Sequence, residues 1–192
     1  MSERLTPDIS DCLSQGWELY LKDPVLLSGA TVLLALICGA ASMVPFLGAL
    51  VYPPMLAGLY SLIIRLDRGE AITINNLFDG FQRFVPLVIA SVLISLLVAV
   101  GLILLVLPGL YLIIAYGFTT LLIIDQKQDF WPAMENSRKI INAHFWSYTL
   151  LALVLAVICM VASLPLGLGL IIAGPVCIAA QYRYYLAVRA LA

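Results

Sequence analysis

The chain has 192 residues, of which 63% are hydrophobic and 11% are charged, and its formal net charge at pH 7 is -1. Soluble domains are about 45–50% apolar and about 25% charged, so this composition excludes an ordinary soluble fold. The apolar residues form three uncharged runs, over 24–64, 84–124 and 145–182. Because these runs are continuous rather than alternating, they favour membrane-spanning helices over a β-barrel.

The first unit is expected over 7–66. Residues 1–23 show no secretion-signal pattern, so we expect the first span to be retained. Apolar and polar side chains up to residue 22 fall on opposite faces of a helix, which predicts an amphipathic helix at the membrane interface. Its candidate aromatic anchors are Trp17 and Tyr20.

The uncharged run that follows in this first unit has 41 residues. As one helix it would be about 60 Å long, twice the hydrocarbon thickness, so it must fold back. The candidate turn residues are Pro45 and Gly48, and the candidate breaks in the second span are Pro53 and Pro54.

The second unit is expected over 74–125. It begins with another amphipathic segment, in which Phe81 is the candidate interfacial aromatic residue. The next uncharged run again has 41 residues and must reverse near its middle. Proline and glycine disfavour continuous helix, so they mark the turn. The turn residues are Pro108 and Gly109, and the candidate break is Gly117.

The third unit is expected over 130–190. Its amphipathic helix and the start of its 38-residue run carry two tryptophans at the depth of an aromatic belt, Trp131 and Trp146. The candidate turn residues are Pro165 and Gly167, and the candidate breaks are Gly174 and Pro175. The sequence therefore predicts an all-α membrane protein, one membrane domain over 1–192. Its six transmembrane helices form three Pro/Gly-turned helical hairpins, each preceded by an interfacial amphipathic helix.

The three units are expected to be copies of an internal repeat. A small residue precedes the turn proline by 29, 28 and 28 positions, namely Gly16, Gly80 and Ser137. Repeats of this length indicate stacked copies of one supersecondary unit. The ten basic residues all lie outside the three predicted turns. Since basic residues stay on the cytoplasmic side, both termini are predicted to be cytoplasmic.

Residues that would carry chemistry are scarce. The three runs contain no Asp, Glu, Lys, Arg or His, which argues against a proton-coupled transporter, a cation channel or an intramembrane protease. The four cysteines form no C-x-x-C pair, and His144 is the only histidine. We therefore expect no catalytic residue, no cofactor, no metal site and no nucleic-acid partner.

Several motifs together resemble a broad group of bacterial six-span membrane proteins of unassigned function. They are Arg68-Gly69-Glu70, 77–81 (LFDGF), 107–112 (LPGLYL), 133–137 (AMENS) and Phe145-Trp146. The group is related to the membrane domain of some glycerophosphoryl diester phosphodiesterases and to YciC-like proteins. The resemblance implies a multi-pass protein of the bacterial cytoplasmic (inner) membrane. It implies no phosphodiesterase activity, because the catalytic domain has no counterpart in this chain.

The expected function is that of a non-enzymatic membrane protein with an accessory, assembly or lipid-interacting role. Its expected partners are membrane lipids, and a membrane or cytoplasmic protein partner and self-association are left open. The alternative is a carrier or exporter of an apolar or lipidic solute. Matched breaks in repeated halves indicate transporter sites, and Pro53-Pro54 and Gly174-Pro175 are such a pair.

Overall fold

The structure is a computed structural model that describes residues 7–44, 46–164 and 167–191. The described residues form helices and no strand, which confirms the all-α prediction. In chain order the elements are α1 (Ile9–Lys22), α2 (Pro24–Ala41), α3 (Leu47–Asp67), the 3-10 helix η1 (Ile74–Arg83), α4 (Phe84–Leu104), α5 (Val106–Ala115), α6 (Thr119–Asp125), α7 (Phe130–Ala143), α8 (Phe145–Ser163) and α9 (Leu170–Leu191).

Five segments among the described residues are long and apolar enough to cross a membrane. They are Pro24–Ala41, Leu47–Asp67, Ile74–Leu104, Val106–Asp125 and Phe145–Ser163. By length and composition, these segments are consistent with the predicted multi-pass membrane protein. The last helix, α9, has 22 residues but carries Gln181, Arg183 and Arg189 in its C-terminal half.

Each amphipathic helix joins its span through a sharp junction. Asp23 separates α1 from α2, and its side chain accepts a hydrogen bond from the Leu26 backbone N–H at 3.1 Å. Pro24 follows as the first helical residue, where its missing N–H removes no helix hydrogen bond. No residue separates η1 from α4, and only His144 separates α7 from α8. The short junctions fix the direction of each span relative to the helix before it.

The chain reversals differ in detail from the predicted turns. Between α4 and α5 the break lies at Leu105, whose backbone is extended, and Pro108 and Gly109 lie in the first turn of α5. A proline is tolerated there because the first N–H groups of a helix have no partner within it. Gly109 instead permits close packing, since a methyl group on it would overlap Leu102. Gly167 does lie in a turn, with a φ of 78° that favours glycine.

The first reversal has a different geometry. Phe46 begins α3 with a left-handed φ of 67°, and Gly48 lies within the first turn of α3 against Ser42. Pro45 and Pro165 lie outside the described residues.

One of the three candidate breaks interrupts a helix. The chain leaves helical geometry between α5 and α6, around Gly117. In contrast, α3 continues through Pro53 and Pro54, and α9 continues through Gly174 and Pro175, where we expected breaks. Proline is tolerated inside membrane helices when neighbouring groups or local backbone adjustments satisfy the freed carbonyl.

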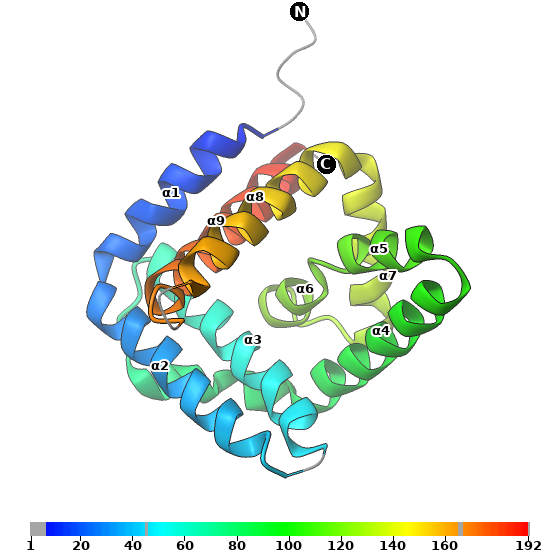
Figure 1. The fold of residues 1–192 in the computed structure, drawn as a ribbon. Coiled ribbons are helices and arrows are strands. Elements are labelled where there is room, and N and C mark those ends of the chain that lie inside the picture. The colour runs from blue at the N-terminus through cyan, green and yellow to red at the C-terminus, as the bar shows by residue number, and fades with distance from the viewer. Residues whose placement is uncertain (1–6, 45, 165–166, 192) are drawn as a thin grey trace, which may run out of the picture.

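The amphipathic helices connect the three units in a ring. Helix α1 packs on α9, η1 packs on α3, and α7 packs on α6. Each amphipathic helix therefore lies against the last helix of the preceding predicted unit, and the first unit follows the third to close the ring. Figure 1 shows the resulting closed arrangement, with α1 and α9 side by side although they lie at opposite ends of the chain.

The core lies at one end of the molecule, which we call the base. It contains the second half of α3, α6, the C-terminal part of α9 and the apolar faces of α1, η1 and α7. The opposite ends of the hairpins expose large apolar side chains, among them Leu36, Phe46, Ile103, Leu107 and Leu164. Of the most apolar stretch in each span, 61% is buried in α3 but only 17% in α2, 17% in the segment with α4 and 11% in α8. The first helix of each hairpin is thus the outer one.

Candidate functional site: a polar base below an uncharged hollow

A partly buried amide joins the inner helices of all three predicted units. The Gln181 side chain, on α9, accepts a hydrogen bond from the Tyr60 hydroxyl of α3 through Oε1. Its Nε2 donates to the Tyr148 hydroxyl at 2.8 Å and to the Gly117 carbonyl at 3.0 Å. The break between α5 and α6 leaves carbonyls without partners in their own helix, and Gln181 satisfies one of them. We call these four residues the upper polar layer.

A carboxylate connects the same three segments eight residues closer to their C-terminal ends. Asp125, at the end of α6, accepts hydrogen bonds from Arg68 Nη2 at 2.6 Å and from Arg189 Nη1 at 3.0 Å. The Tyr185 hydroxyl lies 3.2 Å from the same carboxylate. The Asp125 side chain is only 4% exposed. A buried carboxylate is costly unless it is paired and hydrogen-bonded, and here it is both. Arg68, Asp125, Tyr185 and Arg189 form the lower polar layer.

The two layers repeat one spacing in three helices. Tyr60 is followed by Arg68, Gly117 by Asp125 and Gln181 by Arg189, each eight positions later. Eight residues advance a helix by about 12 Å, or a little over two turns. Each layer thus takes at least one residue from, or directly after, the predicted second span of every unit, and Gly117 lies in the turn between α5 and α6.

Three small residues bring the amphipathic helices into close contact with these inner helices. A methyl group on Gly16 would lie 2.7 Å from the Ala180 backbone nitrogen, and one on Gly80 would overlap the Pro54 carbonyl. The third, Ser137, is fully buried. Its hydroxyl donates to the Ala115 carbonyl at 2.9 Å and accepts from the Phe118 N–H at 3.1 Å. Ser137 therefore satisfies backbone groups that the α5–α6 break leaves free.

The geometry of η1 sorts its side chains into three rows. A 3-10 helix has three residues per turn, so residues three apart lie above one another. Phe78, Phe81 and Phe84 form an exposed aromatic row, with ring centroids 6.3 and 6.2 Å apart. Leu77 and Gly80 form the row that is buried against α3.

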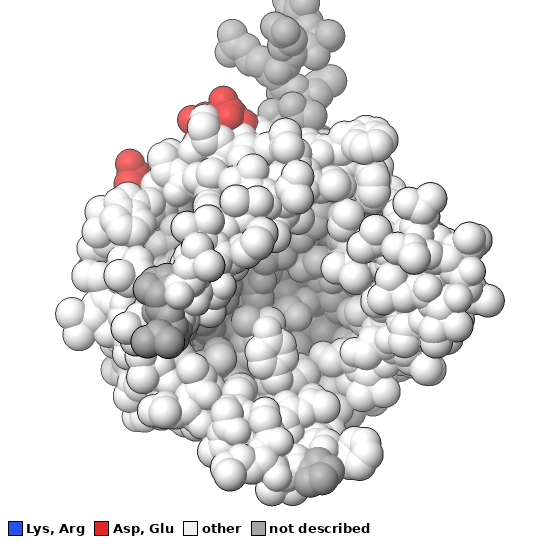
Figure 2. Space-filling view, viewed as in Figure 1, with Lys and Arg blue, Asp and Glu red and all other residues white. Residues whose placement is uncertain are grey.

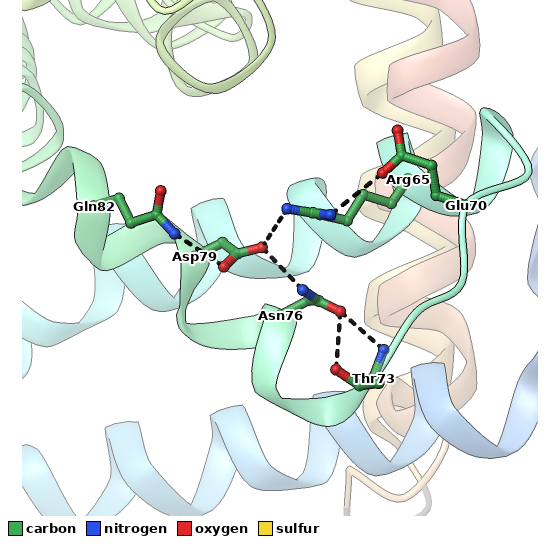
Figure 3. Close-up of polar contacts among 6 residues, drawn as sticks. All are labelled: Arg65, Glu70, Thr73, Asn76, Asp79 and Gln82. Carbon is green, nitrogen blue, oxygen red and sulfur yellow. Dashed lines mark hydrogen bonds and ion pairs between the residues drawn. The ribbon is translucent and has the colours of Figure 1, made fainter.

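The third row of η1 is polar and connects to α3 (Figure 3). Asn76 Nδ2 donates to Asp79 at 3.2 Å, and Gln82 Nε2 donates to Asp79 at 3.1 Å. Arg65 of α3 binds Asp79 at 3.0 Å and Glu70 at 3.3 Å. Thr73 and Asn76 form a capping box that begins η1. These contacts fix η1 to the end of α3.

A cavity of about 290 Å³ opens beside these contacts, between the end of α3, η1 and the segment after α6. Four basic side chains line it: Arg65, Arg68, Arg83 and Lys127. Three acidic side chains line it as well: Glu70, Asp79 and Asp125. We call it the base cavity.

The opposite face of the molecule is hollow and apolar. In Figure 2 the surface around the central hollow is mainly uncharged, and the acidic side chains in view lie at the outer rim of the molecule, away from the hollow. A second cavity, of about 410 Å³, lies between α3 and α4. It is lined by Ala49, Ser91, Val92, Ser95 and Leu96. Its lining is apolar apart from the hydroxyl groups of Ser91 and Ser95.

Most of the candidate interfacial aromatics are exposed. Trp17, Phe81, Trp131 and Trp146 expose between 38 and 82% of their surface. Tyr20 differs, because it is buried and its hydroxyl bonds the Ser28 hydroxyl at 2.8 Å. Tyr20 therefore packs α1 against α2 and does not lie in an exposed aromatic belt.

Three ionisable groups on the amphipathic helices have shifted pKa values: the pKa of Cys12 is raised, that of Glu135 is lowered, and that of Arg138 is raised by its hydrogen bonds to Glu135. Burial raises the pKa of the Cys12 thiol, and neighbouring Asp11 and Asp8 raise it further. On α7, the hydrogen bonds from Arg138 hold the pKa of Glu135 below its usual value.

The sulfur atoms of Cys159 on α8 and Cys177 on α9 lie 3.7 Å apart. Within the described ranges, no three His, Cys, Asp or Glu side chains cluster so that they could hold a metal ion.

Comparisons with protein-family models, curated proteins and solved structures found no match. The two polar layers and the base cavity were not predicted from the sequence. Their members lie far apart in the chain, and Gln181 and Asp125 stand at or near the ends of uncharged runs. The only signal in the sequence is the common spacing of eight residues, which becomes visible once the three helices are aligned.

Proposed function

We propose that this chain is a non-enzymatic, lipid-interacting protein of the bacterial cytoplasmic membrane. In this proposal it has six spans in three hairpins, and α9 is the sixth. A helix of 22 residues is about 33 Å long, enough to cross the hydrocarbon layer. The polar C-terminal half of α9 finds its partners inside the base, so its hydrophilic side chains need not face lipid.

The distribution of charge supports a cytoplasmic base. Arg65, Arg68, Arg83 and Lys127 line one cavity, and Arg189 joins them through Asp125. Arg183 of α9 pairs with Asp67 at the same end of α3. Basic residues near the ends of spans stay on the cytoplasmic side, so the hollow faces the opposite leaflet.

The uncharged hollow is the observation that carries the lipid-interacting role. The hairpins surround a hollow whose surface is mainly uncharged in Figure 2, and many of their large apolar side chains are exposed. Exposing apolar surface to water costs about 25 cal/mol per Å². Within a bilayer, lipid acyl chains fill such a space more favourably than water does. Lipid would then be a structural part of the folded protein.

Lipid retention tests this proposal. The purified chain, in a mild detergent with neutral phosphatidylcholine, should retain lipid at a defined stoichiometry in native mass spectrometry. Ser95→Phe fills the cavity between α3 and α4 and should reduce the retained lipid. Val25→Phe is the matched control, because Val25 is exposed at the start of α2 and outside the lining of that cavity. Equal, heterogeneous lipid in all three proteins would contradict the proposal.

A carrier of an apolar or lipidic solute is the second candidate. The helix break at Gly117, with Gln181 and Tyr148 beside it, is the observation that favours it. The continuous helices at Pro53, Pro54 and Pro175 do not add to this support. A carrier should move a fluorescent lipid between the leaflets of proteoliposomes faster than empty vesicles do, and Gln181→Leu should abolish the effect. Equal rates with and without protein would remove this candidate.

A further inference from the structure

We propose that the base cavity binds a phosphate group, carried by an anionic lipid or by a soluble phosphate compound. The cavity lies where three chain segments meet, and its volume of about 290 Å³ accommodates a phosphate with part of a headgroup. As a lipid site it rests on the proposed function, because that proposal places the base at the membrane surface.

The charges that line the cavity do not cancel. Arg65 is bound by Glu70 and Asp79, so both of these carboxylates are engaged. Asp125 is shared between Arg68 and Arg189. In the part of the chain that the structure describes, Arg83 and Lys127 have no carboxylate within ion-pair distance. With Arg189 included, five cations surround three carboxylates.

An anion is therefore the complementary ligand. A phosphodiester carries one negative charge, and a phosphomonoester carries about -1.5 to -2 at pH 7. Guanidinium groups bind phosphate oxygens through two parallel hydrogen bonds, and lysine adds a point charge. Ser61 and Gln82 supply uncharged donors on the same wall. A metal cation is disfavoured, because the three carboxylates already bind arginines.

The chain positions the unpaired cations at headgroup depth. Arg83 immediately precedes α4, and it follows Leu77 and Gly80 at intervals of three, on the row of η1 that packs on α3. Lys127 follows α6 and has a left-handed backbone with a φ of 54°, uncommon for a residue other than glycine. Arg65 and Arg68 lie at the end of α3. All four therefore lie where spans leave the hydrocarbon layer, at the depth of lipid phosphates.

The experiment compares three double variants with the unmodified protein. Arg83→Gln/Lys127→Gln removes the unpaired cations and leaves every ion pair in place. Lys22→Gln/Lys139→Gln removes the same charge from exposed sites outside the lining of the cavity. The delipidated full chain in neutral detergent is titrated with phosphatidylglycerol or with phosphatidylcholine, and native mass spectrometry counts the bound lipid.

We expect one phosphatidylglycerol to bind more tightly than phosphatidylcholine. A basic residue near a membrane surface contributes about 1 kcal/mol toward anionic lipid, or about 5-fold in affinity. The cavity variant should therefore lose about 25-fold and the control variant much less. Arg83→Lys/Lys127→Arg keeps both charges and should keep binding within about 5-fold of the unmodified protein. If this charge-conserving variant binds normally, a loss of binding in Arg83→Gln/Lys127→Gln reflects the missing charge rather than a disturbed fold at these positions.

A third arm separates the two sources of phosphate. Sodium phosphate and glycerol phosphate are added to the delipidated protein, and thermal unfolding is followed. Stabilisation by these compounds that disappears in the cavity variant, with no selectivity for phosphatidylglycerol, assigns the site to a soluble phosphate. Equal binding of every probe by the unmodified protein and the cavity variant would overturn the anion site. Phosphatidylcholine retention in the hollow is measured separately. The lipid-interacting function and the anion site can therefore fail independently of each other.

Discussion

Gly80 and Gly58 show how two backbones come together at the centre of the base. A methyl group on Gly58 would overlap the Leu77 carbonyl, and one on Gly80 would overlap the Pro54 carbonyl. The overlapped atoms belong to the backbone, which cannot move aside as a flexible side chain can. Glycine at both positions therefore sets the distance between η1 and α3, and with it the position of Arg83 and Asp79 in the base cavity.

Gly80→Ala is expected to destabilise the protein. The added methyl group forces η1 away from α3, and overpacking of this kind costs typically about 1–3 kcal/mol. Thermal unfolding in detergent measures the effect, as a lower midpoint. Gly39→Ala is the control, because a methyl group on Gly39 meets nothing within 4 Å and alanine favours helix. An unchanged midpoint for Gly80→Ala would show that the close approach is not needed.

The sequence identified Gly16, Gly80 and Ser137 as equivalent small residues, but it indicated neither their contacts nor the role of Gly58. Gly16, Gly80 and Ser137 were aligned as equivalent positions, and all three lie where an amphipathic helix packs on an inner helix. Their partners belong to another unit, and no local pattern indicates which one. Gln181 was missed for a related reason, because a single amide near the end of an apolar run has no periodic signature.

At the scale of whole elements, the sequence predicted helices better than their ends. The length of each uncharged run required a reversal, and the described parts of all three runs contain two or more helical segments. The position of a reversal depends on packing: α4 ends at Leu104, and Pro108 fits the first turn of α5 without loss of a hydrogen bond. Pro53, Pro54 and Pro175 were expected to break helices, but a proline alone does not end a helix that neighbours support.

The sixth span can be tested by thiol labelling. In a chain whose four cysteines are replaced by alanine, Leu168→Cys and Ala190→Cys place single thiols before and near the end of α9. Both positions are exposed. If α9 crosses the membrane, an impermeant reagent should label position 168 in intact spheroplasts and position 190 only after lysis.

Lys139→Cys, on the amphipathic helix α7, provides the matched control for the cytoplasmic side. It should behave as position 190 does. Labelling of positions 168 and 190 from the same side would leave five spans. Labelling of position 139 in intact spheroplasts would reverse the proposed orientation.

At the scale of the molecule, Asp125 holds the ends of three helices together. Its carboxylate binds Arg68 from α3 and Arg189 from α9 while lying at the end of α6. These helices end the three predicted units, so one buried carboxylate joins all of them. The sequence placed every one of these residues on the same side of the membrane but could not show that they meet.

Asp125→Asn should weaken this junction throughout the base. The substitution keeps the shape but removes the charge that faces two arginines. Because both arginine side chains are 53% exposed, solvent compensates them in part, and we expect a loss of about 1–3 kcal/mol. Thermal unfolding should show a lower midpoint. Glu135→Gln, which removes a carboxylate from an exposed ion pair on α7, should change the midpoint little. If both substitutions lowered the midpoint equally, Asp125 would contribute no more to stability than an exposed ion pair does.

The contact between α1 and α9 has a consequence for synthesis. The ribosome makes α1 before α9, so α1 waits at the membrane while the five intervening spans of the proposed topology are inserted. Throughout this time its Gly16 face has no helix to dock on. Insertion of α9 then closes the ring and supplies Gln181 and Arg189 together. A product truncated before α9 would lack this closure, and its Gly16 face would stay undocked.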